Sequence, residues 1–440
     1  MRRASFGVFV ANAAAAGAAL ATAVVTARAL GAAGRGQYSL AMLLAAVMVT
    51  LGGLGFGTAA TFFVARERSR RTVIAGSTVL ISAVIGLVLL ATGLAVVTTV
   101  KLPFRDLPVR YVVLAAVSIP FALLLMNVQS LFLGLERFRE WNAITFAQAA
   151  VPLLLVSVAL YAAGAGAEGV IGVSVVGTIV IALALVLWLQ RTVGIAWRLD
   201  REYLRRAAGY GIRTHVTNAM GFLGYRLDIL LVGGFLSPAR VGLYTVAVAT
   251  GERLWMLSQA ASTVLFPRIA AEEGEGRTDT STPFIARNVL YATALGAALV
   301  FALSRPLVTI LYSDAFEAAV TPLRILLPGI VLLGASRVLA NDLAARNRPT
   351  INAYIGAASL AANVVLNVVL IPAHGIAGAA AASTVSYSLA FVLTLVAYAS
   401  ISGGGLGVLA PQRSDLELWR NLASVALRGR RGRSGQSGTR

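Results

Sequence analysis

Long uninterrupted apolar segments constrain this chain more than any other feature of its sequence. Runs of about 20 or more mostly apolar residues recur along its 440 residues, and an α-helix needs about that number to cross a bilayer. The twelve runs lie near 6–27, 38–63, 73–99, 111–134, 142–163, 169–190, 209–235, 241–267, 286–312, 320–341, 351–371 and 376–400. They do not alternate as membrane β-strands do. The sequence therefore predicts an all-α integral membrane protein with about 12 transmembrane helices.

The composition excludes several classes of function. Charged residues make up only 12% of the chain, about half the fraction in a soluble domain. The sequence contains no cysteine, and its two histidines, His215 and His374, lie on different segments. The single lysine, Lys101, follows Val100, so a phosphate-binding loop ending in Gly-Lys-Ser/Thr is absent. We expect no metal site and no cofactor.

The basic residues predict the orientation of the chain. A net charge of +19 would suggest nucleic acid in a soluble protein, but here the charges flank membrane segments, so topology and anionic membrane lipids explain them better. With the N-terminus inside, 26 of the 37 basic residues fall in cytoplasmic loops and tails and 8 in outer loops. The positive-inside rule then places both termini in the cytoplasm. We interpret the first run as a spanning helix rather than a cleaved signal peptide.

Two distant matches at one spacing indicate an internal duplication. The first matches Leu30, Ala33, Gly36, Tyr38 and Ala41 to Leu236, Ala239, Gly242, Tyr244 and Ala247, 206 residues later. The second matches the segment GVIG at 169–172 to GIAG at 375–378, at the same spacing. An even number of spans in each unit makes the halves parallel repeats related by an axis along the membrane normal.

The segments that flank the second half are too charged to span a membrane. Residues 197–206 combine four arginines with Leu199, Tyr203 and Leu204, which is typical of a helix on the inner leaflet. The predicted organisation is a six-helix N-terminal lobe (1–195), an interfacial connector (196–208), a six-helix C-terminal lobe (209–400) and a cytoplasmic amphipathic and basic disordered tail (401–440).

Charged residues inside the predicted spans indicate where function lies. An ionisable side chain in hydrocarbon costs roughly 2.5–3.5 kcal/mol on insertion scales, so it usually faces a cavity or a partner. The seventh and eighth runs carry Arg213, Arg226, Asp228, Glu252 and Arg253, whereas the interiors of the first six runs carry no charge.

Helical periodicity collects polar and small residues of these two runs into stripes. The seventh run places Thr214, Asn218, Gly221, Tyr225 and Asp228 on one face, and the eighth places Thr245, Ala249, Glu252, Met256, Gln259 and Thr263 on one face. Hydrogen bonding between packed helices explains such stripes. A water-accessible cavity is the alternative, and we favour it for the five charged residues.

Several segments, taken in order, resemble a known family. They are LGAAGRGQYSLAM, GFGTAATFFVARE and LGLERFREWNAI in the first half, and YRLDILLVGGFLSPARVGLYTVAVATGERLWML, VLFPRIA and NVVLNVVLIPAHGIAGAAAASTVSY in the second. The chain resembles the polysaccharide-export flippases of the multidrug/oligosaccharidyl-lipid/polysaccharide (MOP) superfamily. The resemblance implies a V of two lobes around a central cavity, alternating access, and a transporter rather than an enzyme. Its substrate would be a polyprenyl-diphosphate-linked oligosaccharide in the bacterial plasma membrane, and a polysaccharide polymerase is a candidate partner.

The resemblance also implies a cavity whose arginines bind the diphosphate. The candidates here are Arg213, Arg226 and Arg253, with Arg28 and Arg35 at the outer end of the first lobe. Coupling or cavity roles would fall to Asp228, Glu252, Asn218 and Gln259.

Three other functions remain as alternatives. A cation-coupled multidrug exporter of the same superfamily should carry an acidic residue inside the first lobe, where this chain has none. A lipid-linked peptidoglycan precursor flippase usually has more than twelve helices and arginines deep in its first helix. A membrane glycosyltransferase or polymerase needs catalytic carboxylates and a large outer loop, and the longest outer loop here holds only Asp314 and Glu317.

Overall fold

The protein is helical throughout the part of the chain that can be described. A computed structural model describes residues 2–99, 106–255, 281–346, 348–402 and 406–413, together with residues 415 and 420. All regular elements within these ranges are helices, and 8 of them are long and apolar enough to cross a membrane. The prediction of an all-α, multi-pass membrane protein is confirmed.

The first six predicted spans correspond to the helices that precede residue 193. These are α1 (Arg2–Gly52), α2 (Phe56–Arg66), the 3-10 turn η1 (Arg68–Arg70), α3 (Arg71–Thr99), α4 (Val109–Ala116), α5 (Ile119–Gly134), α6 (Phe138–Tyr161) and α7 (Ala167–Thr192).

The later spans correspond to the remaining elements. These are α8 (Arg201–Phe235), α9 (Pro238–Gly251), η2 (Glu252–Leu254), α11 (Ser281–Ala302), α12 (Ser304–Tyr312), η3 (Asp314–Ala319), α13 (Val320–Ala345), α14 (Pro349–Ser402) and η4 (Leu406–Leu409). The second half of the predicted span 241–267 and most of the predicted tail lie outside the described residues.

Single glycines replace two of the loops that we expected between spans. Helix α1 contains the first span and most of the second, and α14 contains the last two. Each changes direction at one residue with positive φ, Gly31 (φ 65°) in α1 and Gly375 (φ 58°) in α14. Glycine adopts this left-handed conformation without a steric cost, so the helix bends without a loop.

Other predicted spans are interrupted. The second breaks between α1 and α2, where Leu54 and Gly55 have φ of 50° and 73°. The fourth breaks before α5, whose first turn contains Pro120. The ninth is divided between α11 and α12. A hydropathy pattern does not show these interruptions, because the residues at the breaks are themselves mostly apolar or small.

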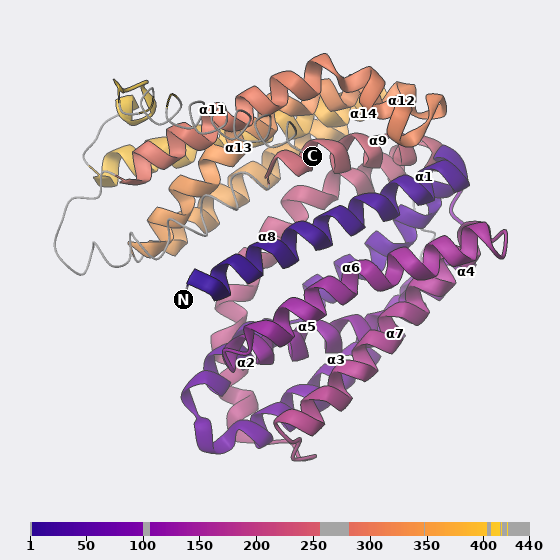
Figure 1. Cartoon of the computed structure of the whole chain (residues 1–440), viewed down its shortest axis with the longest axis vertical. Coiled ribbons are helices and arrows are strands. Elements are labelled where there is room, and N and C mark those ends of the chain that lie inside the picture. The colour runs from indigo at the N-terminus through magenta and orange to yellow at the C-terminus, as the bar shows by residue number, and fades with distance from the viewer. Residues whose placement is uncertain are drawn as a thin grey trace, which may run out of the picture. The chain divides into compact units, whose positions relative to one another are not determined.

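The chain forms two compact units. Unit 1 contains Met1–Glu252, Val300–Leu327 and Gly356–Ser386, and unit 2 contains Arg253–Leu299, Pro328–Ile355 and Tyr387–Arg440. Within unit 1, α1 lies between α6 and α9 (Figure 1). The lobe bounds taken from the repeat, 1–195 and 209–400, stay a prediction, as does the connector at 196–208. Residues 201–208 of that connector form the first part of α8, which begins at Arg201.

The contact between α1 and α9 supports the duplication. A Cβ on Gly36 would lie 1.7 Å from the carbonyl oxygen of Pro238, and a Cβ on Gly242 would lie 2.0 Å from that of Ala32. Gly242 follows Gly36, and Pro238 follows Ala32, by the same 206 residues. The two contacts are therefore equivalent and reciprocal, as a two-fold axis between repeated units requires.

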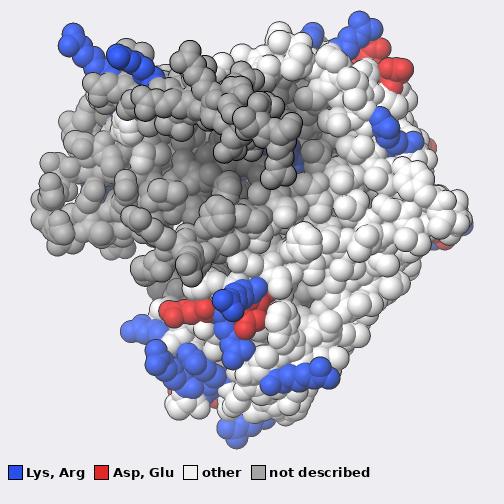
Figure 2. Space-filling view, in the orientation of Figure 1, with Lys and Arg blue, Asp and Glu red and all other residues white. Residues whose placement is uncertain are grey.

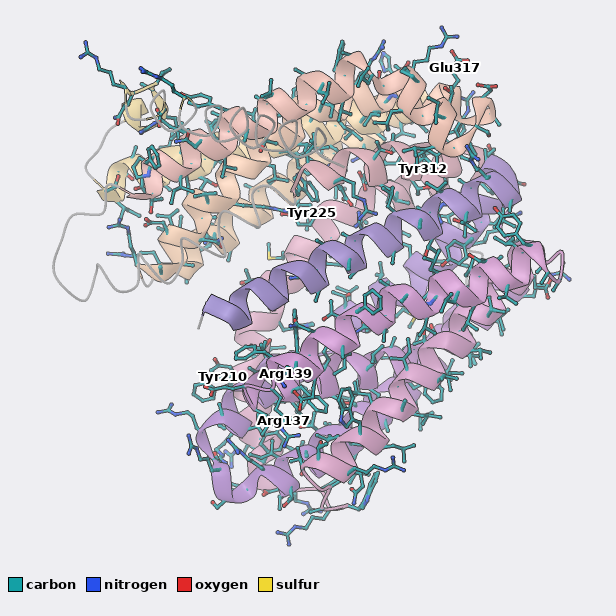
Figure 3. All side chains as sticks on the ribbon, in the orientation of Figure 1. Arg137, Arg139, Tyr210, Tyr225, Tyr312 and Glu317 are labelled. Atoms are coloured by element: carbon teal, nitrogen blue, oxygen red, sulfur yellow. The ribbon has the colours of Figure 1, made fainter. Side chains whose placement is uncertain are left out.

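Five labelled residues mark the two ends of unit 1. Arg137, Arg139 and Tyr210 lie toward one end, and Tyr312 and Glu317 lie toward the other (Figure 3). Basic and acidic side chains also gather around the beginning of α3 and the end of α7 (Figure 2). Charged side chains also lie at the upper right of the same view (Figure 2), so the orientation from the positive-inside rule stays a prediction.

An ion-pair network at that end joins α2, η1 and α8. Arg70 pairs with Glu67, Asp200 and Glu202, and Arg206 pairs with Glu67 at 2.8 Å. These pairs fix the start of α8 against the turn between the second and third predicted spans.

Candidate functional site

A cavity of about 220 Å³ in unit 1 collects several of the predicted site residues. It lies among α1, α8, α9 and η2, and its lining residues are Arg35, Ser39, Leu43, Arg226, Ile229, Thr245, Val248, Ala249 and Glu252. Three of the nine predicted binding and coupling residues, Arg35, Arg226 and Glu252, therefore share one cavity. Thr245 and Ala249 come from the predicted stripe of the eighth span.

Arg226 and Glu252 form a bidentate ion pair on this cavity. The Nη1 atom of Arg226 donates to Oε1 of Glu252 at 2.7 Å, and Nη2 donates to Oε2 at 3.1 Å. The side chains are 32% and 18% exposed. Two parallel charge-assisted hydrogen bonds fix both groups in position, and the carboxylate neutralises the Arg226 guanidinium in this conformation.

Arg35 is the cation of the cavity that lacks a carboxylate partner among the described residues. Its Nη1 donates to the Thr26 hydroxyl at 2.8 Å, and its guanidinium lies 5.6 Å from the centre of the Tyr38 ring. Its Nε atom is buried and has no hydrogen-bond acceptor within the described ranges. With Arg226 balanced by Glu252, the lining carries a net charge of +1, which suits an anionic group.

Asp228 lies in a separate buried network rather than on the cavity. Its side chain is only 2% exposed. Tyr244 donates its hydroxyl to Oδ2 at 2.6 Å, Ser383 donates to the same oxygen at 3.0 Å, and the backbone N–H of Ile229 donates to Oδ1 at 2.7 Å. The network thus joins α8, α9 and α14, and it satisfies a carboxylate that would otherwise be unpaired at membrane depth.

The network continues along α14 through two asparagines. Asn363 donates to the Ser383 hydroxyl at 3.4 Å, and Asn367 donates to the Oδ1 of Asn363 at 3.0 Å. The side-chain oxygen of Asn367 is buried without a donor among the described residues. Oxygen atoms therefore dominate this part of unit 1.

Sequence comparison decides the family. Residues 2–272 match the family described as polysaccharide biosynthesis protein, which is more than half of the chain. The chain belongs to that family. The resemblance noted from the sequence is thus confirmed.

A curated relative carries a related description. Over 216 residues the chain is 26% identical to the probable low-salt glycan biosynthesis flippase Agl15 of Haloferax volcanii. The alignment covers 46% of this chain and 45% of the relative. The chain therefore matches about half the length of that curated relative.

Solved structures show the fold. The chain matches the lipid II flippase MurJ in an inward closed conformation with a TM-score of 0.77 and 13% identity, covering 89% of this chain and 87% of the other. It matches an inward-facing multidrug resistance transporter of the MATE family, MOP superfamily, with a TM-score of 0.72 and 12% identity, covering 89% and 95%. Identities this low establish a shared fold only. The family member therefore has the two-lobed, all-helical fold of these transporters, as predicted.

Arg28, predicted to bind the head group, contacts a helix end in the structure. Its Nε donates to the carbonyl oxygen of Leu311 at 2.8 Å, and its Nη2 donates to that of Ile310. Both carbonyls belong to the last turn of α12, next to Tyr312 (Figure 3). A cation at a helix C-terminus is favourable, so in this conformation Arg28 caps α12.

The remaining predicted residues lie elsewhere. Arg253 is in η2 and belongs to unit 2, and Asn218 is exposed on α8. Arg213 is in α8, but its side chain is outside the described part of the structure, as is the whole of Gln259. Their predicted roles in binding or coupling stay predictions.

Ser383, Asn363 and Asn367 of α14 were not identified from the sequence as members of the buried network. Tyr244 was named only as one of the residues that match between the two repeats. Tyr244 follows Tyr38 by 206 residues, and both hydroxyls lie near a serine of the last helix in the same half. Tyr38 and Ser174 are 3.4 Å apart, and Tyr244 and Ser383 are 3.5 Å apart. The repeat could therefore have singled out the two tyrosines, although it gave no sign that Tyr244 also binds a carboxylate.

Proposed function

We propose that this chain is a flippase that moves a polyprenyl-diphosphate-linked oligosaccharide from the inner to the outer leaflet by alternating access, for the export of a cell-surface polysaccharide. Membership of the polysaccharide biosynthesis protein family supports the class of substrate. The relative named as a glycan biosynthesis flippase supports the class of activity.

The observation that carries the proposal is the Arg35 guanidinium in the cavity, which has no carboxylate partner in the described part of the chain. Phosphate oxygens match the planar donors of arginine, and arginine stays charged at every physiological pH. A diphosphate needs such a site because its charge cannot cross hydrocarbon unaided. The prenyl chain would stay in the lipid while the head group crosses between the lobes.

Arg226 gives the cavity a second cation. In the present conformation Glu252 occupies its donors. A diphosphate carries enough negative charge to replace that carboxylate, because phosphate oxygens accept the same bidentate bonds. Binding would then release Glu252, which makes this residue a candidate for coupling to protons or another cation.

Asp228 is the second coupling candidate. Its carboxylate is buried among hydroxyl and amide groups of three helices, an arrangement that can hold a proton or a small cation. Transport does not require coupling to an ion gradient. The membrane potential itself favours outward movement of an anion, by about 2.3 kcal/mol per charge per 100 mV.

The proposal includes a cellular setting. The protein would lie in the bacterial plasma membrane with both termini in the cytoplasm, where its basic loops contact anionic lipids. A polysaccharide polymerase on the outer side would receive the flipped substrate. The net positive cavity opposes the alternative of an exporter for cationic drugs.

Lipid extraction from a strain lacking the gene tests the proposal. We expect a polyprenyl-diphosphate oligosaccharide to accumulate on the inner leaflet, and the unchanged gene to reverse this. Arg35→Gln should lower flipping about tenfold or more, because a charge-assisted hydrogen bond contributes about 1.5–3 kcal/mol.

The matched control is Arg240→Gln, since Arg240 is exposed at the start of α9. That variant should flip normally. If the deletion strain accumulates no lipid intermediate and is more sensitive to cationic drugs, the chain is a drug exporter rather than a flippase.

A further inference from the structure

A second cavity in unit 1 has a different chemical character. It lies among α5, α6 and α7 and has a volume of about 280 Å³. Its lining residues are Ala122, Leu125, Met126, Gln129, Gln148, Pro152, Thr178 and Ile181. No charged side chain is among them, so this cavity does not favour a phosphate.

Two glutamines are among the three polar side chains that line this cavity, the third being Thr178. Gln148 donates through Nε2 to Oε1 of Gln129 at 2.8 Å, and Gln129 donates through Nε2 to the Thr145 hydroxyl at 3.0 Å. Thr145 in turn donates to the carbonyl of Trp141 at 2.9 Å. This chain of hydrogen bonds orients both amides. Each amide group has two donor hydrogens and an acceptor oxygen, so both retain capacity for another ligand.

The backbone of α6 adds an acceptor at the same place. Pro152 lies inside the helix and lines the cavity. Proline has no N–H, so the carbonyl four residues earlier, that of Gln148, receives no helical hydrogen bond from it. The hydroxyl of Thr178 on α7 donates to the Ser174 carbonyl at 3.0 Å, which leaves its oxygen able to accept.

These groups lie within three candidate membrane spans, Val109–Gly134, Phe138–Tyr161 and Ala167–Thr192. Gln148 and Thr178 are near the middle of α6 and α7. Polar groups at such depth usually serve a transported ligand or a contact between helices. The amides here line a cavity, and none of its lining residues is charged.

We propose that this cavity binds an uncharged, hydroxyl-bearing group. Given the proposed function, on which this step rests, that group is a sugar of the lipid-linked oligosaccharide. A sugar hydroxyl both donates and accepts, which matches an amide and a threonine hydroxyl. Leu125 and Ile181 provide apolar surface for the C–H groups of a sugar ring.

The size of the cavity limits what it holds. Small-molecule sites fall in a range of roughly 300–1,000 Å³, and 280 Å³ lies just below the lower limit of that range. The cavity therefore holds a single sugar residue rather than the whole oligosaccharide. The two cavities bind different parts of the substrate: Arg35 binds the diphosphate, and Gln129 and Gln148 bind a neutral sugar.

The test uses the full-length protein in detergent and separates the two parts of the substrate. One probe is a polyprenyl diphosphate without sugar. The other is the oligosaccharide released by mild acid from the lipid that accumulates in the deletion strain. Gln148→Leu and Thr178→Val should each weaken oligosaccharide binding, about tenfold for the glutamine, and leave polyprenyl diphosphate binding unchanged. Arg35→Gln should do the reverse.

Two controls keep the result interpretable. Thr178→Val preserves the side-chain shape, so it remains informative if Gln148→Leu fails to fold. Gln37→Leu removes a glutamine that contacts the Asp106 carbonyl outside the cavity, at 3.4 Å, and should change neither affinity.

Three outcomes decide between the proposals. If Gln148→Leu and Thr178→Val bind the oligosaccharide normally, the sugar site is overturned. The proposed flippase function is still supported in that case if Arg35→Gln binds polyprenyl diphosphate more weakly. Tighter polyprenyl diphosphate binding by Gln148→Leu overturns the sugar site in favour of the prenyl chain. If the unchanged protein binds neither the polyprenyl diphosphate nor the oligosaccharide, both the sugar site and the proposed function are overturned.

Discussion

Asp200 caps the helix that carries Arg226 and Asp228. Its carboxylate accepts the backbone N–H of Tyr203 at 3.1 Å, the usual arrangement at a helix N-terminus. Hydrogen bonding to that N–H, opposed by burial and assisted by Arg70, lowers the pKa of Asp200 below its ordinary value. The charged form is therefore the one that stabilises the fold.

This capping bond predicts a pH-dependent loss of stability. Asp200→Ala should lower the free energy of unfolding by about 0.5–2 kcal/mol at pH 7. Because the folded pKa is depressed, the contribution is present above the unfolded pKa of about 3.9 and is lost as the pH falls through the lower, folded value. Thermal unfolding in detergent at pH 7 and below pH 4 measures both effects.

Asp200→Asn separates the cap from the charge. Asparagine caps helices about as well as aspartate, so most of the stability at pH 7 should return, without the ion pair to Arg70. Equal melting temperatures for Asp200→Ala and the unchanged protein at pH 7 would contradict the role of the cap.

Individual charged residues could be chosen from the sequence, but their partners could not. Arg226 and Glu252 are conspicuous because charge is costly in a membrane span. Their pairing joins two helices, and nothing in the periodicity of either helix indicates it. Arg28 reaches carbonyls 282 and 283 residues away. Such contacts depend on how helices pack, which a single sequence does not specify.

The close packing of α1 on α9 gives a prediction about helices. Gly36→Ala and Gly242→Ala should each destabilise the protein by about 1–3 kcal/mol, the usual cost of overpacking. The added methyl group would meet backbone carbonyls, at 1.7 Å and 2.0 Å, rather than a mobile side chain. Thermal unfolding of the purified variants measures the effect, and reciprocity predicts losses of similar size.

Gly221→Ala is the matched control for these substitutions. It lies in α8 with no atom within 4 Å of the added methyl group, and alanine favours a helix over glycine. Its stability should stay the same or rise. A tolerated Gly36→Ala would show that the two helices are farther apart than the structure indicates.

A buried ion pair attaches the segment after α14 to α11. Arg287 donates through Nε to Oδ2 of Asp415 at 2.8 Å and through Nη2 to Oδ1 at 3.2 Å. The two side chains are 2% and 4% exposed. Burial raises the pKa of Asp415, but the bonds from Arg287, the Gln412 N–H and Asn288 outweigh it, so the pKa is lowered overall.

Breaking this pair should release the segment. Asp415→Ala leaves the Arg287 charge buried without its carboxylate, which costs about 3–5 kcal/mol in comparable pairs. We expect a lower melting temperature and faster trypsin cleavage after Arg413. The control is Ser400→Ala, at an exposed site on α14, which should change neither property. Unchanged cleavage of Asp415→Ala would contradict the attachment.

For the molecule as a whole, the fold was the most predictable property. Apolar runs specify spans because the bilayer allows few alternatives to a helix, and the spacing of 206 residues between Gly36 and Gly242 indicated the duplication that their contact supports. The cavities were less predictable. Gln129, Gln148 and Thr178 belong to three different helices, and only the packing of those helices brings the three side chains to a common cavity.

Orientation in the membrane gives the last prediction. Arg139 and Glu317 are exposed and lie toward opposite ends of unit 1 (Figure 3), and the chain contains no cysteine. Single substitutions Arg139→Cys and Glu317→Cys therefore report on one site each. Because arginine-rich loops remain in the cytoplasm, a membrane-impermeant maleimide should label Glu317→Cys in intact cells and Arg139→Cys only after permeabilisation. Labelling of Arg139→Cys in intact cells would reverse the orientation, and outward flipping would then require the substrate to enter from the end of unit 1 that carries Glu317.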